Sequence, residues 1–585
     1  MRLRILASSS LVAGALCVSA VLAGQSSVQF KPGGVGVEFP HIGGGLFNQR
    51  YSTLTQINKS NINRLGAAWM VHPEGTVGQW MQGTPVVVNG TMYMSTGHVW
   101  ARDARTGELK WRYPSGPITS TTTLFNRGVA VAEGKVFSSG AGNTLVALDQ
   151  YTGQVIWKKT IASRGNTNAP AIYHDGLVFM GVGGGEQGVR GQFGAYNAKT
   201  GTEVWKFWTV PGPGEFGNDT WEGDSWKYGG APVWTHPAID PALGMAYFAT
   251  GNAAPDNDGT RRGGDNLFTV SIVALDLKTG KYKWHFQEVH HDIWDYDAPV
   301  APVLADITYQ GQPRKILMHG GKTGMMYILD RTNGKPLIGI VERPVEQEPR
   351  QKTARTQPFP IGDEFVPTCP EPGSVPPGMK SGCVFTPYYD VPTAIAPGTD
   401  GGLSWAPMSY SPQTKLIYVC GTINVSGHEF RLQLFNETTG RLFTPPGTVT
   451  GRGFFGLNYP QPRGGTVTAM DPTLNRIVWQ KRLPWPCGSG SGFLSTASGL
   501  LFHGESDGNL VVHDAFNGDV LWKFQTGAGA DAPVATYEIA GEQYIAILAG
   551  GNQYMRSSMG DNLWAFKLGG TVPQAKAPPL PGPKF

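Results

Sequence analysis

Three carboxylates lie close together in the segment EVHHDIWDYDAP, residues 288–299, which contains Asp292, Asp295 and Asp297. This concentration of acid is unusual because only 15% of the chain is charged. In an extended segment, side chains two residues apart point to the same side, so a strand here would bring Asp295 and Asp297 to one point. A positive group must then lie at that point. The alternative for an isolated pair of aspartates is a solvated acidic turn.

Glycine and proline are abundant along the 585 residues. The chain contains 81 Gly and 44 Pro, which separate short apolar runs and do not form low-complexity blocks. This distribution favours many tight turns between strands and speaks against a helical protein. The net charge is +4, and basic residues are interspersed with acidic ones, so no basic stripe indicates a nucleic-acid partner. The Cys and His spacing does not resemble a zinc site.

The N-terminus has the order of a secretory signal sequence. Arg2 and Arg4 precede an interrupted apolar stretch, and small residues precede a polar run. We therefore predict a signal peptide at residues 1–24, cleaved near Ala23 or Gly24, and a periplasmic protein without a membrane span after signal removal.

Four cysteines remain once Cys17 has left with the signal peptide. Cys369 and Cys383 are close enough in sequence for a disulfide that closes a short loop, while the sequence leaves the connectivity of Cys420 and Cys487 open.

Seven segments share one template that builds the body of the protein. Asp or Asn is followed four residues later by Gly or Asn and eight residues later by Trp, except that the fifth segment ends in Ile338. The first residue begins a turn, Gly takes a positive φ, and the following strand carries the large aromatic. The segments begin at Asp103, Asp149, Asn197, Asp276, Asp330, Asp471 and Asp514.

The spacing of these segments predicts an all-β, eight-bladed β-propeller with tryptophan-docking motifs. Most intervals are roughly 45 to 55 residues, which suits four short strands per blade. The strand-like pair WAPMSYSPQTKLIYVCG at 405–421 is interpreted as a blade that has lost its tryptophan motif. The propeller is expected over 25–570, with a Pro-rich insertion at about 340–400 that covers one mouth of the ring, and a Pro-rich tail at 571–585.

A chain of this kind resembles the quinoprotein alcohol dehydrogenases, which hold pyrroloquinoline quinone (PQQ) and a metal ion on the axis of an eight-bladed propeller. The resemblance extends from YSTLTQINKSNINRLGAAW at 51–69 to DNLWAFKLGG at 561–570. It implies metal ligands in GGGEQGVRG, FATGNAAP and VHHDIWDYD, namely Glu186, Asn252 and Asp295, with Asp295 also the catalytic base. These are hard oxygen donors, which suit Ca²⁺ or a similar cation and not zinc.

The resemblance also implies contacts to PQQ, a planar tricarboxylate that needs cations at its rim and an aromatic floor. Lys322 in GGKTGMMYILD and Arg127 in NRG match the basic residues, and Trp234 in APVWTHPAIDP matches the stacked indole. Thr167 is implied as a further polar contact.

Some positions depart from the family pattern. Thr121 and Thr122 stand where methanol-type and ethanol-type enzymes carry two adjacent cysteines, Gln82 stands where many relatives have glutamate, and Ser404 where many have asparagine. The His-His-Asp run before Trp294 resembles membrane glucose dehydrogenases.

These features predict a periplasmic PQQ- and metal-dependent dehydrogenase that oxidises a primary or secondary alcohol to an aldehyde or ketone. The chain has no CxxCH haem motif and no Gly-rich βαβ fingerprint, so electrons are expected to pass to cytochrome c or another external acceptor and not to NAD. The alternatives are a PQQ-dependent sugar or polyol dehydrogenase and a non-catalytic propeller scaffold of the outer-membrane assembly type.

The metal is expected to be Ca²⁺ or a lanthanide ion. Lanthanide-using members of the family resemble this sequence in a second aspartate two residues after the catalytic one, here Asp297, which is implied as an additional ligand. A trivalent ion gains more from each carboxylate than a divalent ion does. Gly185 is the small residue that would leave room for this ligand. Asp297 could instead bond only to nearby backbone.

Overall fold

The computed structural model describes residues 35–74, 81–114, 127–436, 439, 441–445 and 464–581. The predicted signal peptide and residues Thr121 and Thr122 lie outside the described residues. Strands dominate the described part, and its helical turns are short 3-10 segments. They are η1 (Ile62–Arg64), η2 (Gly185–Gln187), η3 (Asn218–Thr220), η4 (Ser225–Tyr228) and η5 (Pro349–Gln351). Among these residues, no helix has the length and apolar character needed to cross a membrane.

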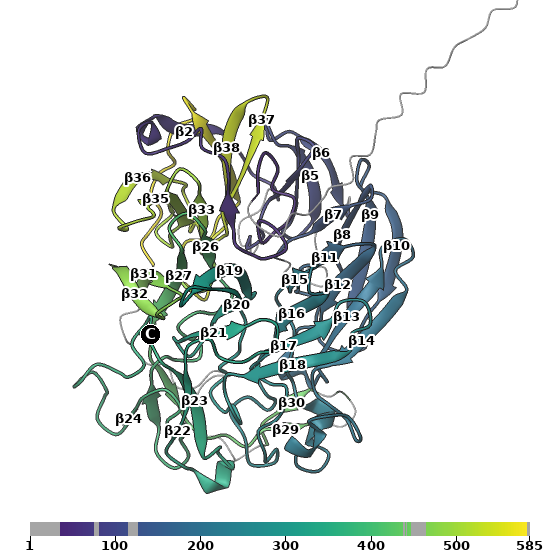
Figure 1. Ribbon diagram of the computed structural model, residues 1–585, viewed down its shortest axis with the longest axis vertical. Coiled ribbons are helices and arrows are strands. Elements are labelled where there is room, and N and C mark those ends of the chain that lie inside the picture. The colour runs from purple at the N-terminus through teal and green to yellow at the C-terminus, as the bar shows by residue number, and fades with distance from the viewer. Residues whose placement is uncertain are drawn as a thin grey trace, which may run out of the picture.

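Eight sheets follow one another around the molecule and form the predicted eight-bladed propeller (Figure 1). The first four blades are antiparallel sheets of four consecutive strands. Blade 1 contains β3 (Val86–Val88), β4 (Thr91–Ser95), β5 (Val99–Asp103) and β6 (Leu109–Tyr113). Blade 2 contains β7 (Ala130–Ala132), β8 (Lys135–Gly140), β9 (Thr144–Asp149) and β10 (Val155–Thr160). Blade 3 contains β11 (Ile172–His174), β12 (Leu177–Gly181), β13 (Gln192–Asn197) and β14 (Glu203–Trp208). Blade 4 contains β15 (Ala238–Asp240), β16 (Met245–Ala249), β17 (Ser271–Asp276) and β18 (Tyr282–Gln287).

The other four blades are less regular. Blade 5 contains three strands, β19 (Val303–Tyr309), β20 (Gln312–Gly320) and β21 (Met326–Asp330). Blade 6 contains β26 (Ser409–Ser411), β27 (Leu416–Ile423), β31 (Gly464–Asp471) and β32 (Arg476–Leu483). Blade 7 contains β33 (Leu494–Thr496), β34 (Leu500–Gly504), β35 (Asn509–Asp514) and β36 (Val520–Gln525), with β1 (Tyr51–Ser52) added in parallel to β33. Blade 8 contains β37 (Ala535–Ile539), β38 (Glu542–Ala549), β39 (Asn562–Leu568) and β2 (Leu65–Val71).

The total of eight blades is confirmed, but one blade was assigned to the wrong segment. The strand-like pair at 405–421 is not a separate blade, because β27 pairs with β31 and so belongs to the blade that carries Trp479. The missing blade is the last one, in which β2 from the N-terminal part pairs with β39. Figure 1 shows β2, in purple, and β38, in yellow, which belong to the same sheet. The sequence pattern could not reveal this blade because its strands come from both ends of the chain.

Tryptophans dock five of the described blades onto the next. The indole of Trp111 in blade 1 donates to the carbonyl of Gln150 in blade 2 at 3.0 Å, and its ring lies where a Cβ on Gly153 would come within 2.5 Å. Two constraints therefore require glycine at this template position: the positive φ of 71° and the indole ring that covers it. The same hydrogen bond to the following blade is made by Trp157, Trp205, Trp284 and Trp479.

The ring is closed by a tryptophan that the template did not include. Trp69 on β2 of blade 8 lies against Gly107 of blade 1, where a Cβ would come within 2.8 Å of its ring. Apolar packing continues across this junction, since one buried cluster joins Trp100 of blade 1, Phe566 of blade 8 and Phe502 of blade 7.

The Pro-rich insertion packs against the acidic segment. It contains β22 (Ile340–Pro344) paired with β23 (Thr356–Pro360), while β24 (Lys380–Gly382), β25 (Thr393–Ile395) and the later β28 (Ser426–His428) form a second small sheet. A further two-stranded sheet pairs β29 (Leu434–Phe435) with β30 (Leu442–Phe443). The indole of Trp294 donates to the carbonyl of Thr386 at 2.8 Å, and the hydroxyl of Tyr296 donates to the carbonyl of Pro397 at 2.6 Å. That the insertion covers one mouth of the ring stays a prediction.

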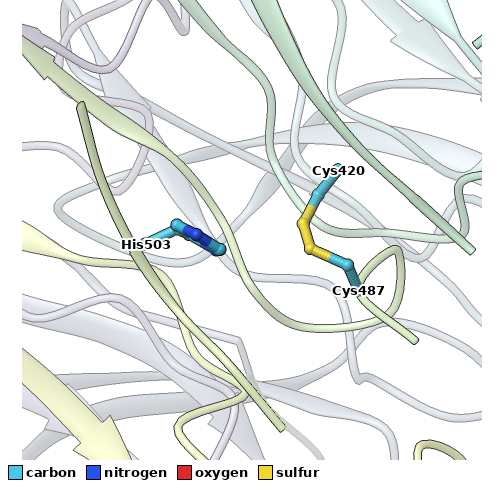
Figure 2. A group of neighbouring side chains, drawn as sticks. All are labelled: Cys420, Cys487 and His503. Atoms are coloured by element: carbon cyan, nitrogen blue, oxygen red, sulfur yellow. A yellow bond between two sulfur atoms is a disulfide. The ribbon is translucent and has the colours of Figure 1, made fainter. Parts of the chain in front are cut away.

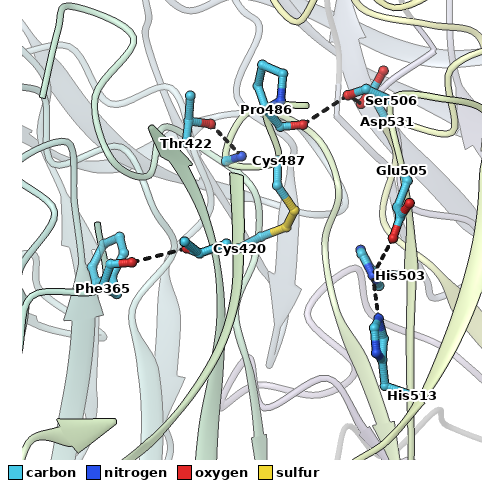
Figure 3. Close-up of a disulfide and its surroundings, with 12 residues drawn as sticks. Phe365, Cys420, Thr422, Pro486, Cys487, His503, Glu505, Ser506, His513 and Asp531 are labelled. Carbon is cyan, nitrogen blue, oxygen red and sulfur yellow. Dashed lines mark hydrogen bonds and ion pairs between the residues drawn. A yellow bond between two sulfur atoms is a disulfide. The ribbon is translucent and has the colours of Figure 1, made fainter. Parts of the chain in front are cut away.

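Two disulfides are present in the described residues. Cys369 and Cys383 are joined as predicted, with an S–S distance of 2.01 Å. The pairing that the sequence left open is Cys420 with Cys487, which ties β27 of blade 6 to the loop that leads into blade 7 (Figure 3).

We predict that Gly280→Ala destabilises the protein more than Gly244→Ala. Both glycines belong to blade 4 and have similar positive φ values, 67° and 63°, but a Cβ at Gly280 would lie 2.6 Å from the Trp205 ring, whereas at Gly244 it would meet nothing within 4 Å. The control should cost about 1 kcal/mol for its backbone conformation, and Gly280→Ala a further 1–3 kcal/mol, roughly, for overpacking. Thermal unfolding measures the difference. Equal melting temperatures would show that the ring contact does not constrain this position.

Candidate active site

One cavity of about 500 Å³ collects nearly all the residues singled out in the sequence. Its wall is built by loops of several blades, from η2 in blade 3 to the β20–β21 loop in blade 5. Among the eight residues with an expected role, seven line it, namely Arg127, Glu186, Trp234, Asn252, Asp295, Asp297 and Lys322. Positions Gln82 and Ser404, where the chain departs from its relatives, also line the cavity, as do Thr399 and Asp400 at the end of the insertion.

The positive group that the acidic segment requires is Lys322. Its Nζ lies 3.0 Å from Oδ2 of Asp295 and 2.5 Å from Oδ2 of Asp297. The solvated turn is excluded because both aspartates are only 5% exposed. The strand interpretation was wrong: the segment forms no strand, and Asp295 has a left-handed φ of 62°. Such a conformation in a non-glycine residue persists only where the surroundings hold it, and it is most frequent at functional sites.

Asp292, the first acid of the segment, holds this unusual conformation. Its buried carboxylate accepts hydrogen bonds from the backbone N–H of Trp294 at 3.0 Å and of Tyr296 at 3.1 Å. His291 contacts the carbonyls of Gly264 and Gln351 through its two ring nitrogens, at 2.8 and 2.7 Å. Burial raises the pKa of Asp292 to about 6 against the effect of its backbone hydrogen bonds. Asp292 is therefore a structural residue that shapes the loop.

Asp297 links the three parts of the site. Its Oδ1 accepts hydrogen bonds from the backbone N–H of Asn252 at 2.9 Å and from the indole of Trp234 at 3.3 Å, while its Oδ2 contacts Lys322. Gly251 leaves the space for this carboxylate, because a Cβ there would overlap Oδ1.

Three carboxylates face one another beside this network. Oxygen atoms of Glu186, Asp256 and Asp295 all lie within 4.8 Å of each other, a spacing suited to one metal ion. Burial raises the pKa of each carboxyl, and the neighbouring carboxylates raise it further. Asn252 joins this group, since its Nδ2 donates to Oδ1 of Asp256 at 2.8 Å and a Cβ on Gly185 would come within 2.5 Å of its Oδ1.

The donor set fits a hard cation. Carboxylate and amide oxygens are the ligands that Ca²⁺ and similar ions take, and Oδ2 of Asp256 is buried without a hydrogen-bond partner among the described residues. Asp256 was missed in the sequence, although the acidic run PDND directly after GNAA could have indicated it.

Another part of the cavity is cationic and aromatic. The guanidinium carbon of Arg127 lies 4.9 Å from the centre of the Trp234 ring and 4.6 Å from that of Trp405, a second indole that the sequence did not single out. Burial lowers the pKa of Arg127 to about 9, so it stays protonated at neutral pH, and its Nε has no partner among the described residues. Side-chain oxygens of Asn166 and Asn168 are likewise buried and unpartnered. This wall fits a planar anion with polar edges.

Thr167 is the expected contact that the structure does not bring to the cavity. Its hydroxyl donates to the carbonyl of Gly140 at 3.4 Å, and its neighbours Asn166 and Asn168 line the cavity instead. The resemblance indicated the right loop, but neighbouring side chains in it face different ways.

A second group of possible metal ligands lies in blade 7. Figure 2 shows His503 beside the Cys420–Cys487 disulfide, and Figure 3 adds Glu505 and His513. The disulfide sulfurs are not thiolate ligands. Nε2 of His503 lies 3.0 Å from Nε2 of His513, and burial lowers the pKa of both rings, so they form a neutral hydrogen-bonded pair. We therefore interpret this group as buried polar packing.

We predict that Lys322→Met destabilises the cofactor-free protein strongly, because it leaves two buried carboxylates without their cation. Removal of one partner from a buried ion pair costs about 3–5 kcal/mol. Adding Asp297→Asn should recover part of the loss, and Lys315→Met in the same blade, whose side chain is 41% exposed and 3.7 Å from Asp306, should have little effect. Thermal unfolding of the three variants measures this.

The loss of stability in Lys322→Met should also depend on pH. Burial and neighbouring carboxylates raise the pKa of Asp295 in the folded protein. Such an acid destabilises the fold as the pH rises above the pKa that the acid has in the unfolded chain. The deficit of Lys322→Met should therefore be smaller at about pH 5 than at about pH 8. A deficit that does not change with pH would contradict the charge-compensation role.

Comparison with known proteins agrees with this geometry. Residues 39–373 and 377–545 match the family model described as PQQ: glucose/ethanol/alcohol dehydrogenase, beta-propeller domain. The chain is 36% identical to the quinohemoprotein alcohol dehydrogenase of Comamonas testosteroni, over 88% of this chain and 72% of that protein. The crystal structure of the quinohemoprotein alcohol dehydrogenase from that organism superposes with a TM-score of 0.74 and 32% identity, covering 92% of this chain and 82% of the other. The lanthanide-dependent methanol dehydrogenase of Methylacidiphilum fumariolicum is 31% identical, over 88% of this chain and 85% of its own length. The chain belongs to the PQQ-dependent alcohol dehydrogenase family of β-propeller enzymes.

Proposed function

We propose that this enzyme oxidises a primary or secondary alcohol to an aldehyde or ketone with PQQ and a metal ion in the cavity described above. The observation that carries the proposal is the pairing of two walls in one buried space. One wall is a cluster of carboxylates that calls for a cation, and the other is an arginine between two indoles that suits a planar anion. A non-catalytic scaffold would have no use for buried charges of this kind, which are costly to maintain.

The cofactor would be held by charge at its rim and by aromatic surface at its face. Arg127 supplies a positive charge for a cofactor carboxylate, and Lys322, which contacts the acidic segment, supplies another. Trp234 and Trp405 offer the aromatic surfaces, and the indole of Trp234 is kept in place by its hydrogen bond to Asp297. When bound, PQQ supplies the acceptor for hydride and the metal ion polarises it.

The metal would be held by Glu186, Asn252 and Asp295, all of which are hard oxygen donors around the same space. Asp297 as an additional ligand stays a prediction. In the structure both of its oxygens already contact protein donors, which supports a role in positioning Lys322 and Trp234. Either Ca²⁺ or a lanthanide ion suits this donor set.

Asp295 is the proposed general base. Burial and the neighbouring carboxylates raise its pKa, which favours uptake of the proton from a substrate hydroxyl, while the ammonium of Lys322 at 3.0 Å steadies the carboxylate before the proton arrives. Lys322 also donates to the backbone carbonyl of Asp295 at 2.7 Å, so that the lysine orients the base as well as compensating its charge.

The electron acceptor is proposed to be an external one-electron carrier such as cytochrome c. The 585 residues contain no CxxCH motif that would attach a haem. The predicted signal peptide at 1–24 supports a periplasmic location, in which such carriers are accessible.

The test is reconstitution of the purified protein with PQQ and either Ca²⁺ or La³⁺, followed by dye-linked turnover on a panel of alcohols, sugars and cyclic polyols. We expect turnover that requires both PQQ and metal, with alcohols preferred. Preference for a sugar or polyol would change the proposed substrate class but leave the proposed cofactor unchanged. Turnover with NAD⁺ in the absence of PQQ would refute the proposal.

We predict that Asp295→Asn lowers kcat by about 10²–10⁴, because proton transfer by a positioned base contributes about that much to the rate. The isosteric change keeps the hydrogen bond from Lys322 to the backbone carbonyl, so the PQQ absorbance of the reconstituted protein should be retained. The matched control is Asp258→Asn, which alters a buried acid that does not line the cavity and should mainly lower stability. A larger loss of kcat in the control than in Asp295→Asn would contradict the assignment.

A further inference from the structure

Asp256 is a buried acid that the expected site does not account for. It follows β16 in blade 4, has 0% exposure, and one of its oxygens, Oδ1, accepts the amide of Asn252 at 2.8 Å. Its other oxygen, Oδ2, is buried and has no hydrogen-bond partner among the described residues. Burying an unpartnered carboxylate oxygen is costly unless something positive contacts it.

The position of Asp256 suggests what that contact is. Its carboxylate lies with those of Glu186 and Asp295, since one oxygen from each falls within 4.8 Å of the other two. No Lys or Arg forms an ion pair with Asp256 in the described residues, whereas Asp295 and Asp297 share Lys322. The unpartnered oxygen therefore belongs to a carboxylate at the proposed metal position.

We infer that Asp256 supplies an additional carboxylate oxygen to the metal ion and makes the site prefer a trivalent cation over a divalent one. This inference rests on the proposed function and names the residue that selects its metal. It differs from the expectation for Asp297, whose two oxygens are engaged by Asn252, Trp234 and Lys322.

The charges around the metal position support a trivalent ion. Three carboxylates meet there, those of Glu186, Asp256 and Asp295. A fourth, Asp297, is joined to Asp295 through the ammonium of Lys322, which offsets one of the four charges. Three negative charges remain, which a trivalent ion balances and a divalent ion does not. Because Coulomb attraction scales with the charge of the ion, loss of one carboxylate weakens the binding of a trivalent ion more than that of a divalent ion.

Asp256 also orients a proposed ligand. By accepting the Nδ2 of Asn252, it turns the Oδ1 of that amide toward Gly185, which is next to Glu186. Only a glycine leaves space there, because a Cβ on Gly185 would come within 2.5 Å of Asn252 Oδ1. The small residue that was expected to make room for Asp297 thus makes room for Asn252.

The experiment compares wild type with Asp256→Asn, which keeps an acceptor for Asn252 and removes the charge, and with Asp256→Ser as a second variant of the same kind. Asp297→Asn tests the competing ligand. The matched control is Asp258→Asn, which changes a buried acid of the same loop whose oxygens are fully occupied by Thr260 and by the backbone N–H of Gln433. Each protein is loaded with PQQ, and the affinities for La³⁺ and Ca²⁺ are measured by calorimetric titration.

We expect the ratio of La³⁺ to Ca²⁺ affinity to fall by about tenfold or more in both Asp256 variants and to change little in Asp258→Asn. An unchanged ratio in both Asp256 variants overturns the inference, as does loss of the preference in Asp297→Asn alone. If wild type binds neither PQQ nor either metal, the proposed function fails as well, so the two failures are distinguishable.

A second readout needs no cofactor. In the metal-free protein the charge of Asp256 adds repulsion to Glu186 and Asp295, and Asp256→Asn removes this charge while keeping an acceptor for Asn252, so it should raise the melting temperature. Asp258→Asn should lower the melting temperature by removing satisfied hydrogen bonds. La³⁺ should then raise the melting temperature of wild type more than that of Asp256→Asn. A lower melting temperature for metal-free Asp256→Asn than for wild type would show that Asp256 has a structural role and would contradict the inference.

Discussion

A buried excess of negative charge is the constraint on which the centre of this protein depends. Asp295 and Asp297 are almost fully removed from solvent, and they are compatible with the fold because Lys322 lies between them. A single lysine cannot neutralise the remaining acids, Glu186 and Asp256, so the apoprotein keeps an uncompensated charge in a place with low dielectric screening. The site is therefore arranged around a cation before any substrate is considered.

The propeller makes this arrangement possible because each blade contributes a loop to the same cavity. Glu186 comes from blade 3, Asn252 from blade 4, Asp295 from the connection between blades 4 and 5, and Lys322 from blade 5. Tryptophans at the outer strands keep the blades in register, so that loops far apart in sequence meet with little freedom. The Pro-rich insertion adds a second support, since it anchors the acidic segment from outside through Trp294.

The sequence allowed the fold and most of the site to be predicted, for different reasons. The blades were visible because each repeat carries a local signal, a turn with glycine followed by tryptophan. Trp69 was missed because its strand is completed by residues at the other end of the chain. The site residues were identified by resemblance, which indicates positions along the chain but not the direction in which each side chain points. Thr167 shows this limit, because its hydroxyl bonds to the Gly140 carbonyl and not into the cavity. The acidic run PDND offered a signal for Asp256, but its place beside Glu186 is visible only in the folded structure.

Closure of the ring sets the order in which this protein can mature. Strand β2 lies near the start of the chain and its partner β39 near the end, so blade 8 cannot form until almost the whole polypeptide has emerged. Contacts between residues so distant in sequence form slowly, because the entropy cost of closing a long loop comes before the favourable energy of those contacts. The cavity is therefore completed only after both ends of the chain have been made. The full set of residues that lines the cavity is available to cofactor and metal only after the ring has closed.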